Sequence, residues 1–176
     1  MTVHPLRNQI PIFLGAEGPR NVKMATEIAD GWLPIFYSPY RHDMYEGITF
    51  PKGFEIACPV TVIVDDDVDA ALSFVKLSLS FYIGGMGAKD RNFHLDVVGR
   101  MGFADDASKI QDLFMSGKRD EAAAAVPDAL ADEISLCGPK ERIRDRLAAW
   151  EESPVTTLLT GTGDEATVRM LAELTA

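Results

Sequence analysis

The chain has 176 residues, of which 47% are hydrophobic and 25% charged, and this is the composition of a folded globular protein rather than a disordered one. Its length suits one domain with its own hydrophobic core. Twenty-seven acidic and seventeen basic residues give a net charge of −10, and no basic stretch is longer than the pair Lys118–Arg119. These features argue against nucleic acids and anionic membrane surfaces as partners.

Targeting signals and cysteine usage indicate a compartment for the chain. No apolar run approaches the roughly 20 residues that span a bilayer. The first residues also lack the charged, apolar and small-residue order of a signal peptide, so we expect a cytoplasmic protein. Cys58 and Cys137 stand alone, with neither a CxxC pair nor the spacing of a zinc site. This favours two reduced structural thiols, with a single long-range disulfide as the alternative.

The first 36 residues contain a strand, a helix and a second strand. Residues 11–15 are a short apolar run bounded by glycine, which predicts a buried strand. Pro19 follows Gly18 at the position where proline is favoured to start a helix. The helical pattern ends at the pair Asp30–Gly31, and residues 32–36 predict the next strand. This order is typical of a βαβ unit with parallel strands.

A long connection and a third strand follow. Residues 37–55 contain two prolines and two glycines among polar and aromatic residues, which predicts a loop of the kind that often forms a lid or a binding loop. Residues 56–64 are rich in β-branched side chains and predict a strand. The run Asp65–Asp67 then precedes an apolar helical face that extends to Tyr82. Helix capping explains these aspartates, and a divalent cation site is the alternative.

The remaining sequence predicts a helical insertion and a last βα unit. Between Gly84 and Gly138 we find short helical patterns and no strand signal, so we expect a helical insertion over about 85–137. After it, a helix opened by a Gly-Pro pair leads to a strand at 155–160 and to a last helix that begins at Asp164. The sequence therefore predicts an α/β fold of four parallel βα units, with the insertion after the third strand.

Several features offer candidate chemistry. The turn at 15–19 joins a strand to a helix, and its glycines would let the backbone approach an anion such as phosphate. An unoccupied tight turn is the alternative, and the Glu17 side chain would have to point away from any phosphate. The turn Gly161–Gly163 is a second possible phosphate turn or a plain connection.

The histidines and the charged residues near the C-terminus predict no reactive cluster. The three histidines are isolated, and neither a zinc motif nor a hydrolytic triad is formed by His4, His42 and His94. A substrate-facing role stays open for the last two, because both lie in irregular regions. Four further charged residues lie close together in the sequence: Glu141, Arg142, Asp145 and Arg146. Their simplest interpretation is an exposed helix face with charge partners at i,i+4.

Three segments together resemble the luciferase-like monooxygenase family, in particular its branch that uses the deazaflavin coenzyme F420. The resemblance covers nearly the whole chain in the family's order, and it is carried by the combination of the segments PIFLGAEGPRNVKMATEIADGWLP, CPVTVIVDDDVDAALSFVKLSLSFYIGGMG and VPDALADEISLCGPKERIRDRLAAWEESPVTTLLTGT. It implies a (β/α)8 (TIM) barrel enzyme that transfers hydride between a flavin or deazaflavin and a small organic substrate. The implied cofactor is coenzyme F420, with FMN as the alternative, and no metal is implied.

The resemblance also implies cofactor-binding residues. The family's cofactor-contacting turn matches Ala16, Glu17, Gly18 and Pro19, and the end of the next strand, beside the cofactor ring, matches Ile35 and Phe36. Glu17 replaces the small or apolar residue that is commonest at its position. The substrate contacts are expected in 37–55 and 84–92.

The number of strands is half of what the family's barrel requires. A barrel of this type has eight strands in about 250 residues. By resemblance, the four strands predicted here are the fifth to the eighth. The chain would then be one partial domain over 1–176. We therefore expect no catalytic residue in this chain and no catalysis by the chain alone. We also expect a homodimer, or an association with the missing N-terminal half, to cover the unpaired strand edges. The alternative function is a non-catalytic half-barrel module for binding or assembly.

Overall fold

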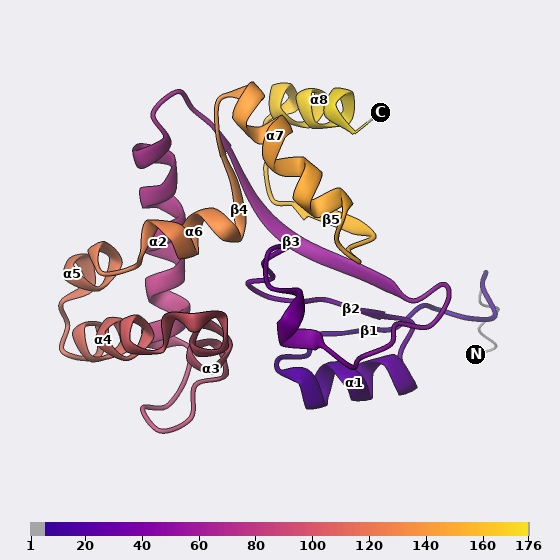
Figure 1. Cartoon of the computed structure of the whole chain (residues 1–176), viewed down its shortest axis with the longest axis horizontal. Coiled ribbons are helices and arrows are strands. Elements are labelled where there is room, and N and C mark those ends of the chain that lie inside the picture. The colour runs from indigo at the N-terminus through magenta and orange to yellow at the C-terminus, as the bar shows by residue number, and fades with distance from the viewer. Residues whose placement is uncertain (1–5, 176) are drawn as a thin grey trace, which may run out of the picture.

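The computed structural model describes residues 6–175, so His4 lies outside the described part of the chain (Figure 1). In this part five strands form one parallel sheet, in which β3 pairs with three of the others. The strands are β1 (Phe13–Leu14), β2 (Gly31–Trp32), β3 (Glu55–Val64), β4 (Ser135–Gly138) and β5 (Thr157–Thr160). An α/β fold with a parallel sheet, as the sequence predicts, is confirmed.

Strand β3 holds the sheet together. Its first residues pair with β2, since Glu55 lies opposite Gly31, and its next four, 57–60, pair with β5. Its last four residues, 61–64, pair with β4. The β-branched residues of this segment favour the extended backbone that ten consecutive strand residues require. The strand predicted at 56–64 is therefore confirmed within one residue.

Three helices cover the sheet and form the first of two cores. Helix α1 (Pro19–Ile28) lies beside β1 and β2, while α7 (Lys140–Glu151) and α8 (Glu165–Leu174) lie beside β4 and β5 (Figure 1). Apolar side chains from these helices and from the sheet are buried together; they include Val22, Trp32, Ile56, Cys58, Val60, Leu136, Ile143, Leu147 and Trp150. This core fixes one face of β3 against the helices.

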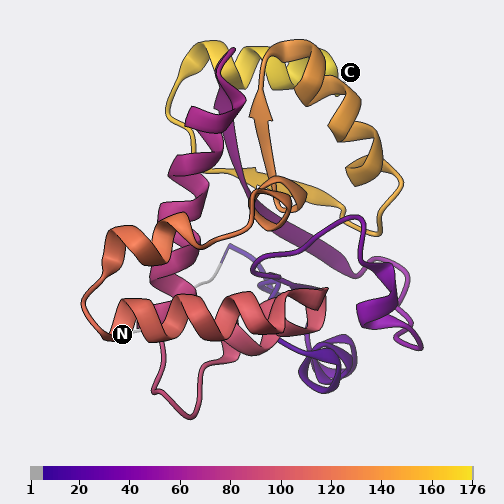
Figure 2. The same ribbon diagram turned by 60° about the vertical axis from the view of Figure 1, so that its left-hand side comes forward.

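The segment between β3 and β4 forms a separate group of helices, seen on the left of Figure 1 and at the front left of Figure 2. It consists of α2 (Val68–Gly85), α3 (Phe93–Val98), the π-helical turn η2 (Gly99–Phe103), α4 (Ala104–Met115), α5 (Arg119–Ala124) and α6 (Asp128–Glu133). Within the described residues α2 is the one helix long and apolar enough to cross a bilayer. It packs as the central helix of the second core, where Leu72, Val75, Leu79 and Ile83 are buried.

The segment 37–55 is partly packed against the core, and its predicted role as a lid or binding loop stays a prediction. Tyr37 and Phe54 are buried, and the ring centroid of Tyr45 lies 4.9 Å from that of Trp32. The Arg41 guanidinium donates two hydrogen bonds, of 2.9 and 2.7 Å, to the Glu133 carboxylate at the end of α6. The aromatic residues that suggested a binding loop thus serve core packing, and the short 3-10 helix η1 (His42–Tyr45) lies within the segment.

Two strand predictions need correction. Strand β4 was not expected, because its four residues are all buried and too few for a period-2 pattern to separate them from the preceding helix. Strand β2 contains two residues, so Ile35 and Phe36 lie beyond it rather than at its end. The insertion is helical as far as Glu133 and then returns to the sheet at Ser135.

The exposed helix face predicted on α7 is confirmed for Glu141 and Asp145 and wrong for Arg142 and Arg146. Arg142 donates hydrogen bonds of 2.9 Å to both carboxylate oxygens of Asp132, and Arg146 Nη1 lies 3.0 Å from the same carboxylate. Both arginine side chains are mostly buried. Asp132 is the last residue but one of α6, so these contacts fasten the helical group to α7 through residues that are ten and fourteen positions apart.

The capping and cysteine predictions are confirmed. Pro19 is the first residue of α1, and Asp67 caps α2 by accepting a 3.0 Å hydrogen bond from the amide of Ala70. Capping therefore accounts for the aspartate run after β3. Cys58 and Cys137 are buried free thiols, and burial raises the pKa of Cys58 to about 12.

The two faces of α2 give a prediction for stability. Leu79 is 1% exposed and Phe74 is 65% exposed on the same helix. Leu79→Ala should lower the free energy of unfolding by about 2–5 kcal/mol, because it leaves a cavity in the helical core. Phe74→Ala should change it by less than about 1 kcal/mol. Urea unfolding of the two variants measures the difference, and equal losses would contradict the assignment of the faces.

Candidate functional site

A cavity of about 660 Å³ lies between the sheet and α2. Its wall is formed by segments at the carboxyl ends of three strands: residues 35–36 after β2, the second half of β3, and residues 160–162 at the end of β5. Helix α2 adds Phe74, Ser78 and Tyr82, which are four residues apart and therefore on one face. In parallel α/β sheets this edge is where ligands bind.

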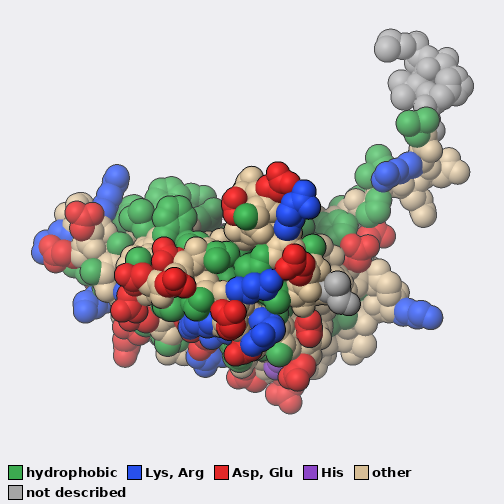
Figure 3. Space-filling view, turned by 90° about the horizontal axis from the view of Figure 1, so that it is seen from above, with side chains coloured by type: hydrophobic (Ala, Val, Ile, Leu, Met, Phe, Trp, Pro, Cys, Tyr) green, Lys and Arg blue, Asp and Glu red, His purple; other side chains and the backbone are tan. Residues whose placement is uncertain are grey.

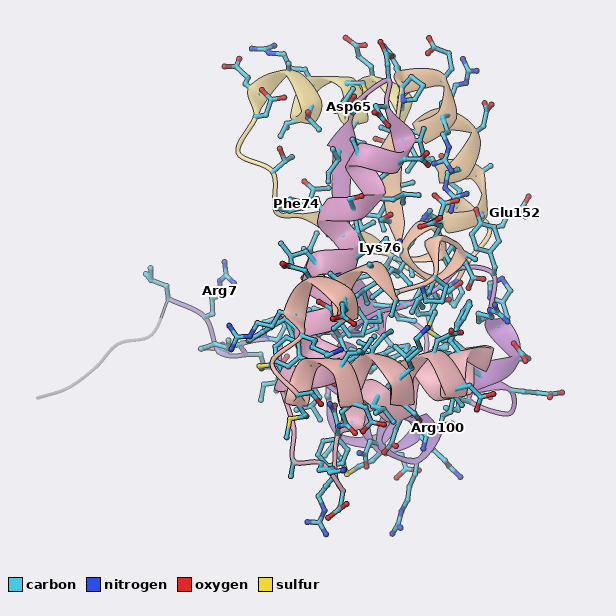
Figure 4. All side chains as sticks on the ribbon, turned by 90° about the vertical axis from the view of Figure 1, so that its left-hand side faces the viewer. Arg7, Asp65, Phe74, Lys76, Arg100 and Glu152 are labelled. Atoms are coloured by element: carbon cyan, nitrogen blue, oxygen red, sulfur yellow. The ribbon has the colours of Figure 1, made fainter. Side chains whose placement is uncertain are left out.

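Among residues 6–175, no Asp, Glu, Lys, Arg or His side chain lines the cavity. Its apolar surface comes from residues such as Ile35, Ile63 and Leu159, and hydroxyl groups come from Thr61, Ser78, Thr160, Thr162 and Tyr82. Figure 4 shows Phe74 on the side of α2 opposite to Lys76, whose ammonium group lies 2.8 Å from the Asp128 carboxylate of α6. The charged residues of α2 are thus held on the far face.

Phe36 contributes backbone strain to the cavity wall. Its φ of 53° is the one positive value at a non-glycine residue in the described chain. A large side chain rarely adopts this conformation, and such strain is concentrated at functional sites. The Phe36 ring meets Tyr82 edge-on, with centroids 5.4 Å apart. The strained backbone thereby holds an aromatic ring against α2 at the mouth of the site.

The turn between β1 and α1 is fixed by a buried hydrogen bond. The Trp32 indole N–H donates to the carbonyl oxygen of Ala16 at 2.8 Å, and both residues are buried. Such a bond replaces the water that the carbonyl would lose on burial. Ala16 therefore belongs to the core, and its side chain does not face the cavity.

Glu17 points away from the start of α1 and pairs with the helical group. Its Oε1 lies 3.1 Å from Nδ1 of His94 on α3, and both side chains are mostly buried. The His94 ring contacts Phe36 and Tyr82 edge-on, with centroid distances of 5.8 and 5.1 Å. The predicted turn residue and the predicted residue Phe36 are thus connected through His94.

Burial changes the acidity of Glu17. Loss of solvent raises the pKa of its carboxyl group above the usual 4.5, the nearby His94 opposes this rise, and Asp96 adds to it. A carboxylate in this position therefore costs the folded state free energy at neutral pH, in proportion to the rise in pKa.

The backbone at Gly18 is bare and lies beside a positive charge. Gly18 has a φ of 77°, and a Cβ atom there would overlap Nη1 of Arg100 from η2. No side chain caps α1. Pro19 has no amide N–H and the Asn21 amide donates to the Gly18 carbonyl, so the amides left free to bind an anion here are those of Gly18 and Arg20, with the guanidinium group next to them. An anionic group such as a phosphate fits this arrangement, because Glu17 is turned toward His94.

Sequence reasoning identified part of this arrangement. It named the turn 16–19 and the pair Ile35–Phe36, and the structure places that pair in the cavity wall. It missed the α2 residues, although their spacing of four was a usable signal. Tyr82 was assigned to the buried face, yet it is half-buried and lines the cavity. The described residues of 37–55 and 84–92, where substrate contacts were expected, do not line it.

The raised pKa of Glu17 gives a prediction for stability against pH. The folded state holds this proton more tightly than the unfolded chain, so wild-type stability falls as pH rises from 4.5 through the raised pKa. Glu17→Gln removes this loss, and its gain over wild type should grow across that window, by about 1.4 kcal/mol per unit of pKa rise. Urea unfolding at pH 4 to 8 measures the gain. Glu27→Gln, at an exposed residue of α1, is the control and should give a flat difference. A Glu17→Gln gain that shrinks with rising pH would contradict the burial effect.

Comparison with known proteins gives a consistent family. The model of the family described as luciferase-like monooxygenase matches residues 1–157. A protein of Mycobacterium tuberculosis that carries the provisional name of a coenzyme F420-dependent oxidoreductase is 45% identical over 97% of this chain and 52% of its own length. A 5,10-methylenetetrahydromethanopterin reductase of Archaeoglobus fulgidus is 24% identical over 86% of this chain and 48% of its own length.

Solved structures show the same fold at low sequence identity. The coenzyme F420-dependent tetrahydromethanopterin reductase of Methanopyrus kandleri matches with a TM-score of 0.65 and 22% identity, over 93% of this chain and 49% of that one. A coenzyme F420-dependent secondary alcohol dehydrogenase matches with a TM-score of 0.58 and 18% identity, over 95% and 48%. The chain thus spans about half the length of the proteins it matches.

The family assignment rests on the extent of these matches. The family model covers well over half of the chain, and the mycobacterial relative matches almost all of it. Both agree with the parallel sheet and with the strand-to-helix turn described above. The chain belongs to the luciferase-like monooxygenase family, within its coenzyme F420-dependent branch.

Proposed function

We propose that this chain forms the cofactor-phosphate turn and one wall of the substrate site in a coenzyme F420-dependent oxidoreductase, which transfers hydride between the deazaflavin and a small organic substrate. The observation that carries the proposal is the uncapped start of α1, where bare Gly18 lies beside Arg100. The names of the relatives support the choice of cofactor.

The residues of the turn have separate roles in this proposal. Free amides at the start of α1 and the Arg100 guanidinium would hold the phosphate of the cofactor. Trp32 keeps the turn in place through the Ala16 carbonyl, and His94 holds the Glu17 carboxylate away from the anion. Ile35 and Phe36 would lie beside the ring, at the edge of the cavity. The bound cofactor would supply the hydride chemistry.

We also propose that the chain is the C-terminal half of a TIM barrel, with one partial domain over 1–176. The lengths of the relatives support this, as do the open edges of the described sheet at β1, β4 and β5, each of which pairs with one strand. The missing strands would supply the remaining ring contacts and the acid or base, so the chain alone should not catalyse. The whole protein would be cytoplasmic.

Cofactor titration tests the proposed function. Coenzyme F420, followed by fluorescence anisotropy, should bind the isolated chain with a Kd above about 10 µM, because half of the site is absent. Gly18→Ala should weaken binding at least about tenfold, since the new Cβ meets Arg100 and the residue keeps a strained φ. Gly163→Ala, where a Cβ meets open space, is the control and should have no effect.

The same titration with FMN separates the two cofactors. Tighter binding of FMN than of coenzyme F420 would contradict the choice of deazaflavin. Submicromolar binding of coenzyme F420 would contradict the claim that decisive contacts lie outside this chain. If neither cofactor binds and the fold is intact, the alternative of a non-catalytic binding or assembly module is favoured.

The exposed apolar groups predict assembly. Ile10 and Ile12 before β1 are 76% and 59% exposed, and Figure 3 shows hydrophobic side chains gathered on part of the surface seen from above. Exposed strand edges of this kind favour pairing with another chain. Light scattering of the 19.3 kDa chain should therefore give the mass of a homodimer, unless the N-terminal half is supplied.

A charge beside the outer edge of the sheet should weaken this assembly. Ile12→Lys is expected to shift the equilibrium at least about tenfold toward monomer, because it places an ammonium group in the interface. Met115→Lys, at an exposed residue at the end of α4, should leave the mass unchanged. A stable, well-folded wild-type monomer would contradict the proposed dimer.

A further inference from the structure

The cavity between β3, β5 and α2 has a composition that selects its ligand. Acidic and basic residues make up 25% of the chain, yet none of them lines this cavity. The wall is partly open to solvent, since Phe74 is 65% and Leu159 is 42% exposed. A carboxylate or phosphate that packs against its apolar side chains loses part of its water and gains no compensating charge. The wall thus favours neutral ligands over anionic ones.

Charged side chains lie behind this wall rather than in it. Glu17 Oε1 lies 3.1 Å from His94 Nδ1, whose ring contacts Phe36 and Tyr82, and Lys76 contacts Asp128 on the opposite face of α2. The wall itself offers neutral hydrogen-bonding groups. Within the described residues the Ser78 hydroxyl makes no hydrogen bond, whereas Ser73 and Ser80 on the same helix each donate to a backbone carbonyl.

The hydroxyl groups come from different parts of the wall. Ser78 belongs to α2, Thr61 to β3 and Thr160 to the end of β5, and all three residues line the cavity together with apolar side chains. A mostly apolar wall with a few polar groups is typical of sites for uncharged organic ligands, which the polar groups orient. The strained φ of Phe36 marks the same wall as functional.

From this wall we infer that the substrate is an uncharged, mainly apolar molecule with a carbonyl or hydroxyl group, which packs against Phe74, Leu159 and Ile63 and receives hydrogen bonds from Ser78 and the threonines. The inference deepens the proposed function and rests on it in one respect: the ligand of this cavity is a substrate only if the chain is part of an oxidoreductase. The selection against charge rests on the cavity alone, and it can be tested without cofactor.

The test compares neutral and anionic probes of one carbon skeleton. Binding of cyclohexanone, cyclohexanol and cyclohexanecarboxylate to the 176-residue chain is followed by NMR chemical-shift changes of residues in α2 and β3. The neutral probes should bind at least about tenfold more tightly than the carboxylate, a difference of about 1.4 kcal/mol. Equal or tighter binding of the carboxylate, or no binding of the neutral probes, would overturn the inference.

Two arginine variants on α2 test whether this wall causes the preference for neutral over anionic probes. Ser78→Arg, at an exposed residue of the cavity wall, should reverse the preference so that the carboxylate binds more tightly than the neutral probes. Ser73→Arg, at an exposed residue outside the wall, should keep the wild-type preference. An unchanged preference in Ser78→Arg would overturn the inference. If the wild type binds no probe and Ser78→Arg loses the dimer, the wall is an interface between chains, and the inference is overturned as well.

The two proposals fail separately. If coenzyme F420 does not bind but the neutral probes select as expected, the cofactor assignment falls and the ligand class of the cavity stands. If coenzyme F420 binds but the probes show no preference for the neutral form, the cofactor assignment stands and the ligand class falls.

Discussion

Strand β3 is the constraint on which the other parts of the structure depend. It is the one described strand that pairs with β2, β4 and β5, and it does so in succession along ten residues. One face of it, with Ile56 and Cys58, is buried against the helices that cover the sheet. The other face, with Thr61, lines the cavity. Because side chains alternate along a strand, a single segment provides both the core and the site.

Burial and charge together explain how the site is shaped. The Trp32 indole fixes the turn through the Ala16 carbonyl, and the His94 ring lies against the Glu17 carboxylate, while the amides of Gly18 and Arg20 remain free. The described residues of the cavity wall are neutral. The Glu17 carboxylate and the His94 ring lie together behind this wall, and the ion pair of Lys76 with Asp128 lies on the far side of α2. An anion-binding turn and a neutral cavity therefore lie side by side, as a phosphorylated cofactor and an uncharged substrate would require.

Local sequence patterns predicted most helices and strands, but they could not predict contacts between residues far apart in the sequence. Strand β3 and helix α2 follow from β-branched runs and helical spacing, and the cap at Asp67 follows from its position. Strand β4 has four buried residues with no periodic signal, and it forms because β3 offers it a partner. Glu17 and His94 are separated by 77 positions, and Arg142 finds Asp132 rather than a neighbour on its own helix. Only the fold brings such pairs together.

The central claim, that the start of α1 binds the phosphate of a deazaflavin cofactor, is tested most directly by amide NMR. On addition of coenzyme F420 the account predicts the largest shift changes at the amides of Glu17, Gly18 and Arg20, because these groups would face the anion. The amides at the start of α8, where the Asp164 carboxylate already accepts from Thr167, should not respond. Changes confined to α8, or none at the turn while coenzyme F420 binds, would contradict the account.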